Sequence, residues 1–144
     1  MDENTTGASG AIPRSDFSRM DEHAEKYYEE IRKRKSDVSA IAKNTGFSVE
    51  DIERIKRHIF INHHDLGKKN PVRFDTNYDM AVSWQRLIDG KNIKEMDIVL
   101  LRHELCELEL MAQGEQHDVA HKKAEAVYNY AKFVKALNEK EGIF

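Results

Sequence analysis

Hydrophobic residues recur along most of this chain at spacings of three and four positions, which is the period of an amphipathic helix. The segments that carry this period are bounded by Ser, Asp, Asn or Gly. No stretch of useful length alternates hydrophobic and polar positions as a half-buried strand would. The pattern predicts an all-α fold of about six helices that closes with an antiparallel helical hairpin, and it assigns residues 21–144 to one helical domain.

Four helices are predicted ahead of the hairpin, over about residues 21–35, 36–46, 48–60 and 75–90, with a loop over 61–73. Ser36 and Ser48 are suited to cap the second and third helices, and Gly46 can adopt the left-handed conformation that ends the second. The fourth helix begins at Asp75 or Asn77.

The lead of the chain, residues 1–20, is rich in Gly, Ser, Thr, Asn and Asp and is predicted to be a disordered linker to something upstream. It contains no apolar signal core, and no run in the chain has the length of a membrane span. We therefore expect no membrane partner and no export signal, which leaves virion-associated and cytoplasmic locations open. The lone Cys106 lies in a helical segment and is interpreted as a small core residue.

The predicted hairpin runs from Asp97 to Tyr130 and folds back at Gly114. On its first helix four residues share a solvent face: Glu95, Arg102, Glu109 and Gln113. His103 and Glu107 point away from that face, and Glu104 lies at its border. Burying such groups costs several kcal/mol unless they pair, hydrogen-bond or hold a metal.

The second helix of the hairpin has a stripe of small residues suited to close packing: Ala120, Ala124, Val127, Ala131 and Val134. His117 and His121 lie on the edge of this stripe. Residues equidistant from the turn of an antiparallel hairpin meet, so His121 comes level with Glu107. His103, Glu104, Glu107 and His121 are therefore predicted to converge.

Imidazole and carboxylate groups are the usual ligands of zinc and of harder divalent cations. His103, Glu107 and His121 are the predicted metal ligands. The HExxH signature of metallopeptidases is absent, because Glu107 occupies the position of its second histidine. The chemistry that fits is metal-assisted hydrolysis of a phosphodiester, with Glu104 as the base.

A second chemistry also fits the residues. His58 or His64 together with His121 can perform acid–base cleavage of RNA without a metal, because histidine titrates near neutral pH. In the metal-assisted mechanism Arg73, or Lys68 and Lys69, would lie near the phosphate. The sequence does not choose between the two mechanisms.

A purely structural interpretation accompanies each of these residues. His103 and His121 can be core histidines that hydrogen-bond to Glu107 and Glu104. Five further residues have ordinary interpretations: a capping or exposed His117, solvated His63 and His64, a capping Asp75 and a core Trp84.

The net charge of −3 gives no support for broad binding to a phosphate backbone, although a local basic groove is compatible with it. The segments around Gly46 have the form of a helix-turn-helix with Ser48–His58 as the recognition helix. Acidic residues at the start of that helix favour a plain packing role instead.

Several motifs occur together in a fixed order: Ile55-x-x-His58-Ile59-Phe60, Arg73-Phe74-Asp75-x-x-Tyr78-Asp79-x-Ala81-x-x-Trp84-x-Arg86-Leu87-x-x-Gly90, His103-Glu104-Leu105-x-Glu107, Ala120-His121 and Tyr128-Asn129. The combination, over about Glu50 to Tyr130, resembles a helical module at the C-terminal ends of bacterial polymorphic toxins and of phage minor head or portal-associated proteins.

The resemblance implies an effector or head-associated module that follows a linker, with nucleic acid, phage head proteins or the parent polypeptide as partners. It supports His58, Glu104 and His121 as catalytic candidates. It also adds three residues to Arg73 as substrate-binding candidates: Asp75, Asp79 and Trp84. A toxin context implies a nuclease, whereas a phage-head context equally permits a non-enzymatic structural or interaction module.

Overall fold

The computed structural model describes residues 12–142, and in this part of the chain the fold is all-α, as predicted. The elements in chain order are α1 (Phe17–Lys33), α2 (Asp37–Thr45), α3 (Val49–Lys56), the π-helical turn η2 (Arg57–Ile61), α4 (Tyr78–Asp89), α5 (Glu95–Ala112), α6 (His117–Val127) and α7 (Tyr130–Lys140). A loop over 62–77 connects η2 to α4.

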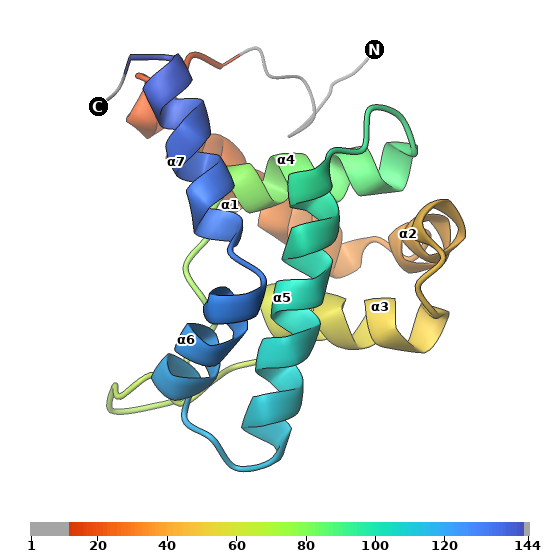
Figure 1. Cartoon of the computed structure of the whole chain (residues 1–144), viewed down its shortest axis with the longest axis vertical. Coiled ribbons are helices and arrows are strands. Elements are labelled where there is room, and N and C mark those ends of the chain that lie inside the picture. Colours follow the sequence, from red (N-terminus) through yellow and green to blue (C-terminus); the bar gives the residue numbers. More distant parts are fainter. Residues whose placement is uncertain (1–11, 143–144) are drawn as a thin grey trace.

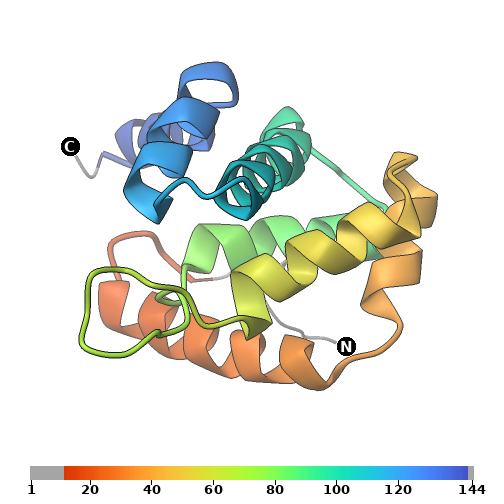
Figure 2. The ribbon, with the colours of Figure 1, turned by 90° about the horizontal axis from the view of Figure 1, so that it is seen from below.

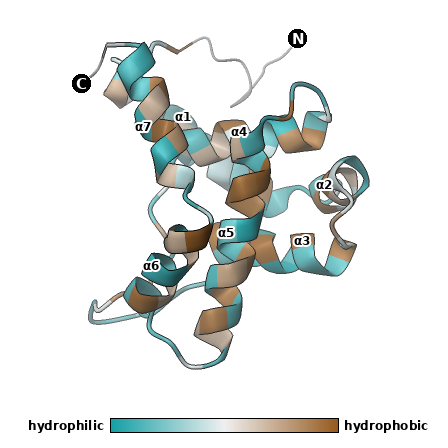
Figure 3. Cartoon of the chain, in the orientation of Figure 1, coloured by the Kyte–Doolittle hydropathy of each residue, from teal (hydrophilic) through white to brown (hydrophobic). Residues whose placement is uncertain are grey.

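The helix α5 is the central element (Figure 1), and it packs against α3, α4, α6 and α7. Seen from below, α1 forms one layer, α3 and α4 form the next, and α5 to α7 cover them (Figure 2). The largest fully buried side chains between these layers include Trp84, Tyr27, Tyr28 and Phe60. Hydrophobic bands follow α5 along its length (Figure 3). No helix in the described part of the chain is long and apolar enough to cross a bilayer.

Side-chain caps are present at α3 and α4, as predicted, whereas Ser36 precedes α2 without a side-chain cap hydrogen bond. The Ser48 side chain accepts a hydrogen bond from the backbone N–H of Asp51 at the start of α3. At α4 the cap is Asn77, which accepts from the N–H of Met80, and not Asp75. Gly90 ends α4 with a positive φ of 70°, and a Cβ there would come within 2.8 Å of the Asn44 side chain. That turn therefore requires glycine.

The first helix begins earlier than predicted. Asp16 caps α1 by accepting from the N–H of Arg19, so residues 17–20 are helical and not part of a linker. Just before the cap, the Arg14 guanidinium contacts the Asp79 carboxylate through two hydrogen bonds, of 2.7 and 3.1 Å. The predicted disorder of residues 1–11 lies outside the described residues.

The second arm of the hairpin is broken where a continuous helix was predicted. The helix α6 ends at Val127, and α7 begins at Tyr130 after the Asn129 side chain caps it by accepting from the N–H of Lys132. Val127 is 68% exposed and Ala131 is also exposed, so the predicted stripe is wrong at these two residues, whereas Val134 packs against a core cluster as predicted. The break raises the helix count in the described chain to seven and releases the carbonyl of Tyr128 from helical hydrogen bonding.

Two buried ion pairs fix the helices against one another. The Lys56 ammonium lies 2.9 Å from a carboxylate oxygen of Asp37, whose other oxygen accepts from the indole N–H of Trp84 at 3.2 Å. Arg86 donates two hydrogen bonds, of 2.8 and 2.7 Å, to the fully buried Asp97. These pairs tie α2 to α3 and α4 to α5.

Candidate metal centre

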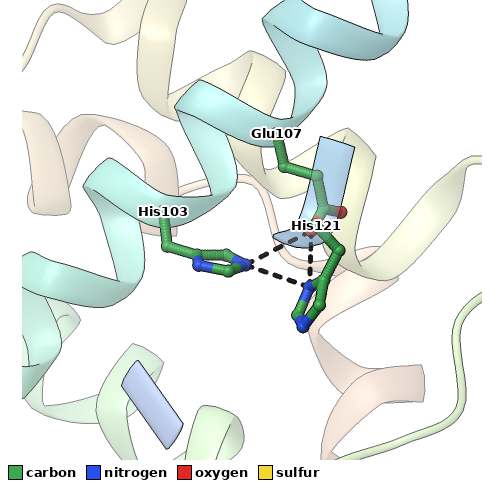
Figure 4. Close-up of side chains that lie close together, drawn as sticks. All are labelled: His103, Glu107 and His121. Atoms are coloured by element: carbon green, nitrogen blue, oxygen red, sulfur yellow. Dashed lines mark hydrogen bonds and ion pairs between the residues drawn. The ribbon is translucent and has the colours of Figure 1, made fainter. Parts of the chain in front are cut away.

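Glu107, 2% exposed, lies at the centre of a group of histidines. Its Oε2 lies 3.2 Å from Nε2 of His103 and 2.9 Å from Nδ1 of His121, and those two ring nitrogens are 3.3 Å apart (Figure 4). The other carboxylate oxygen, Oε1, lies 2.8 Å from Nε2 of His58 and 3.4 Å from Nε2 of His117. One carboxylate therefore meets four imidazoles.

The local geometry of each element explains this convergence. His103 and Glu107 are one turn apart on α5 and face α6, while Glu104 beside them is also buried. His117 and His121 are one turn apart at the beginning of α6. These spacings place both pairs on facing sides of the hairpin, because residues four apart share a helix face.

His58 reaches the cluster from η2, the π-helical turn that continues α3. Such turns are rare and frequently occur at functional sites, because the wider turn redirects a side chain. The backbone carbonyl of His58 accepts a hydrogen bond from Nε2 of His64 at 2.9 Å. His64 in turn exchanges two backbone hydrogen bonds with Val72, and its ring stacks on Phe74 with centroids 4.1 Å apart. The loop after η2 is thus held against His58.

The outer ring nitrogens of two histidines also have partners. Nδ1 of His103 lies 3.0 Å from the carbonyl oxygen of Tyr128, which the break between α6 and α7 makes available. Nε2 of His121 lies 3.6 Å from a carboxylate oxygen of Glu125. Metal-binding histidines characteristically have a carbonyl or carboxylate at the nitrogen that does not bind the metal.

The contact with Tyr128 decides where the proton of His103 lies. A carbonyl oxygen can only accept, so Nδ1 of His103 carries the hydrogen. In the neutral ring Nε2 then presents a lone pair toward the carboxylate of Glu107. Two lone pairs that face each other are repulsive unless a proton or a cation lies between them. The geometry therefore calls for a positive charge at this point.

The pKa shifts follow from burial and from these contacts. Burial alone would raise the pKa of Glu107, but the hydrogen bonds from the imidazoles, led by His103, hold it well below its ordinary value. Burial, and next the charge of Glu107, raise the pKa of Glu104 to about 8. Burial works against protonation of His103, yet the hydrogen bond with Glu107 and the charge of Glu104 raise its pKa. Without a metal, the Glu104 carboxyl therefore keeps its proton up to about pH 8, and the raised pKa of His103 favours the protonated form of that ring.

The distances between the ring nitrogens of His103 and His121 and the Oε2 atom of Glu107 are close to those between ligands of a tetrahedral ion. Ligands at about 2.1 Å from a zinc ion lie about 3.4 Å from one another. The contacts within the set of His103, Glu107 and His121 range from 2.9 to 3.3 Å, so small movements would admit an ion. These three residues form one group of possible ligands, and His58, Glu104 and Glu107 form another.

The cluster is open on one side. The His121 side chain is 43% exposed and that of His117 is 27% exposed, whereas His58, His103 and Glu104 are nearly inaccessible. A cavity of about 390 Å³ lies beside His117, and its lining consists of Asp65, Leu66, Gly67, Gln116, His117 and Asp118. A small substrate or one unit of a polymer can approach from this side.

The predicted convergence of His103, Glu104, Glu107 and His121 is present, with His58 added to it. The four predicted substrate-binding residues are not members of the cluster, although Phe74, between Arg73 and Asp75, packs against the rings of His58 and His117. Trp84 is fully buried in the core, and Asp79 pairs with Arg14. Asp75 is exposed, and Arg73 donates to the carbonyl of Ile61. None of the four contacts the cluster through a hydrogen bond or ion pair in the described part of the chain.

Two histidines were assigned wrongly from the sequence. His117, predicted to be a cap or exposed, contacts Glu107, and its spacing of four from His121 was the available signal. His64, predicted to be solvated, is 8% exposed. Its position depends on the backbone pairing with Val72 across a loop, which no periodic pattern marks. His63 is exposed, as predicted.

The third helix, α3, turns Ile52, Ile55 and the adjoining His58 inward. The exposed Arg57, the first residue of η2, pairs with Glu53 of α3 at 2.9 Å. This arrangement agrees with the packing role that its acidic start favoured.

Comparison of the chain with protein-family models, with curated proteins and with solved structures gave no match. The function is therefore argued from the geometry and chemistry of the cluster.

Proposed function

We propose that this domain is a metal-dependent hydrolase of nuclease type, derived from a phage or toxin effector, with its metal at His103, Glu107 and His121. The observation that carries the proposal is the meeting of three ligand atoms, Nε2, Oε2 and Nδ1, within 3.3 Å of one another on the accessible side of the cluster. Two histidines and a carboxylate with an open position are a common arrangement at catalytic zinc.

The residues around the ligands have definable tasks. The carbonyl of Tyr128 and the carboxylate of Glu125 orient His103 and His121 so that the correct nitrogen of each faces the ion. A divalent ion bound there would polarise a phosphoryl oxygen and lower the pKa of water. His117, part exposed beside the cavity, is placed to exchange a proton with a substrate at this opening.

Support for a phosphodiester substrate comes from the loop that borders the cavity. Lys68 and Lys69 are exposed immediately after Gly67, which lines it. Lysines are ordinary partners of phosphate groups. The resemblance to modules of polymorphic toxins points the same way. Metal-free cleavage fits the geometry less well, because His58 and His64 are buried and cannot reach a substrate.

The competing function is a non-enzymatic, head-associated interaction module in which the cluster is structural. The observation that favours it is that both oxygens of Glu107 lie within 3.4 Å of imidazole nitrogens, which can satisfy them by hydrogen bonding. Such a network contributes to stability when every member is satisfied. The two functions differ in whether the cluster changes when a metal is supplied.

The test is a cleavage assay on the full chain, purified without a polyhistidine tag. Single-stranded DNA, duplex DNA and RNA are offered with zinc or manganese, with and without chelator. We expect metal-dependent cleavage of at least one substrate and its loss in Glu107→Gln. The matched control is Glu109→Gln, on the solvent face of the same helix, which should retain full activity.

Absence of cleavage under every metal, together with a lower unfolding temperature in Glu107→Gln, would support the structural module instead. Circular dichroism of both variants establishes that a loss of activity is not a loss of fold.

A further inference from the structure

Glu107 presents its two carboxylate oxygens to two different sets of ligands. Oε2 faces His103 and His121, which are the ligands of the proposed metal. Oε1 faces His58 at 2.8 Å and His117 at 3.4 Å. A carboxylate with separate partners at each oxygen is arranged as a bridge between two ions.

Glu104 supplies the second carboxylate of the set around Oε1. Its Oε1 lies 3.7 Å from Nε2 of His58, and its Oε2 lies 3.8 Å from Nε2 of His103. These separations are too long for hydrogen bonds but close to the spacing of about 3.4 Å between ligands that share one ion. His58, Glu104 and Glu107 are all buried, and their ligand atoms lie within 4.8 Å of one another.

The position of Glu104 also argues against its predicted role as a general base. It is buried between His58 and His103 and does not line the cavity beside His117. A base must come within hydrogen-bonding reach of the substrate or its attacking water. An inward-facing carboxylate between two imidazoles is better placed to hold an ion.

We propose that the cluster is a two-metal centre in which Glu107 bridges the ions. His103 and His121 complete the first site, and His58 and Glu104 complete the second, with His117 at its open side. This inference rests on the proposed function for the first site and adds a second ion to it.

The charge of such a centre defines the class of substrate. Two divalent cations supply four positive charges, and Glu104 and Glu107 supply two negative ones, while the imidazoles are neutral. The remaining positive charge faces an opening where an anion can enter. Two-metal centres with ions about 3.5–4 Å apart stabilise both the attacking and the leaving oxygen in phosphoryl transfer. A phosphate ester is therefore the ligand that this centre fits.

The experiment measures metal content per chain in the tag-free full-length protein, loaded with manganese and passed through a desalting column. Wild type is expected to hold two ions, and its electron paramagnetic resonance spectrum to show exchange coupling. His58→Ala and Glu104→Gln should each hold one ion and lose the coupling. His121→Ala should retain only the ion of the second site. His63→Ala, which alters an exposed histidine of the loop, is the matched control and should keep both ions.

Glu104→Gln is expected to fold normally, because the glutamine side chain is isosteric with the protonated glutamate. A lost ion in this variant therefore reports on metal binding and not on misfolding. One ion in wild type, fully retained in both His58→Ala and Glu104→Gln, would overturn the two-metal centre and leave the proposed single-metal function intact. No bound ion in wild type would overturn both.

Discussion

The buried polar clusters around Asp37 and around Glu107, both in the described part of the chain, are built on different principles. Around Asp37, each contact joins a group that can only donate to a group that can only accept: the Lys56 ammonium and the Trp84 indole both donate to one carboxylate. Around Glu107, four imidazoles meet one carboxylate, and each ring nitrogen can be a donor or an acceptor. The first cluster has one fixed arrangement of protons, whereas the second must select among several.

The two clusters also differ in their access to solvent. The side chains of Asp37 and Lys56 are 0% and 6% exposed, while the Glu107 cluster opens through His121 at 43%. A closed cluster with matched charges holds helices together. An open cluster that needs an added positive charge is suited to bind one from solution. Both clusters are buried and polar, so these two properties alone do not identify a metal site. The two clusters differ in whether each donor already faces an acceptor.

The largest expected effect is on the closed cluster. Asp37→Ala should lower the free energy of unfolding by about 3–5 kcal/mol, because it leaves the Lys56 ammonium buried without its carboxylate. Urea unfolding followed by circular dichroism measures this loss. Metal content of the folded fraction should be unchanged. A loss of metal in the folded fraction of Asp37→Ala would show that metal binding at the Glu107 cluster depends on the Asp37 cluster.

Metal removal should act on the open cluster alone. At free metal 100-fold above its dissociation constant, the bound ion should stabilise the wild type by about 2.7 kcal/mol, and a chelator should remove this gain. Thermal unfolding of wild type with and without chelator measures the difference. In Glu107→Gln the chelator should have no effect. An equal response of the two proteins would place the binding ion outside the cluster.

The pH dependence of the metal-free protein should report on Glu104. Burial and the charge of Glu107 raise the pKa of this carboxyl from 4.5 to about 8 in the folded state. The folded state then retains a proton that the unfolded state has released, so this stabilisation is present at low pH and is lost as the pH rises through 8. Between pH 7 and 9 the free energy of unfolding should fall by roughly 1.4 kcal/mol.

Glu104→Gln supplies the comparison for that pH profile. The amide cannot ionise, so its unfolding curve should lose this part of the slope between pH 7 and 9. Denaturant unfolding at several pH values, with chelator present throughout, measures both proteins. An identical slope in wild type and variant would mean that Glu104 is ionised in the metal-free fold.

The smallest effect is expected at Asp79, which the resemblance marked as a substrate-binding position. Asp79 pairs with Arg14, and both side chains are slightly accessible at 13% and 12%. Asp79→Asn should lower the free energy of unfolding by about 1 kcal/mol and leave metal content and cleavage unchanged. A tenfold loss of cleavage with an intact fold would return Asp79 to the substrate site.

Helical periodicity was sufficient to predict the all-α class and the meeting of His103 and Glu107 with His121, because both depend on spacings within helices and on one turn at Gly114. The position of His58 in the cluster depends on a π-helical turn, and such a turn leaves no periodic pattern in the sequence. His64 required a backbone pairing with Val72 across a loop. The break at Tyr128 depends on the cap at Asn129, and it supplies the carbonyl that orients His103. The side chains of Trp84 and Asp79 are held by the distant partners Asp37 and Arg14, which sequence spacing does not reveal.

The central claim is that His103, Glu107 and His121 bind a divalent ion. The most direct test is a crystal structure of tag-free protein soaked in zinc, with diffraction data collected on both sides of the zinc absorption edge. The account predicts an anomalous peak about 2.0–2.2 Å from Nε2 of His103, Oε2 of Glu107 and Nδ1 of His121. An unchanged cluster with no anomalous peak between these atoms, at a zinc concentration that occupies other surface sites, would contradict it.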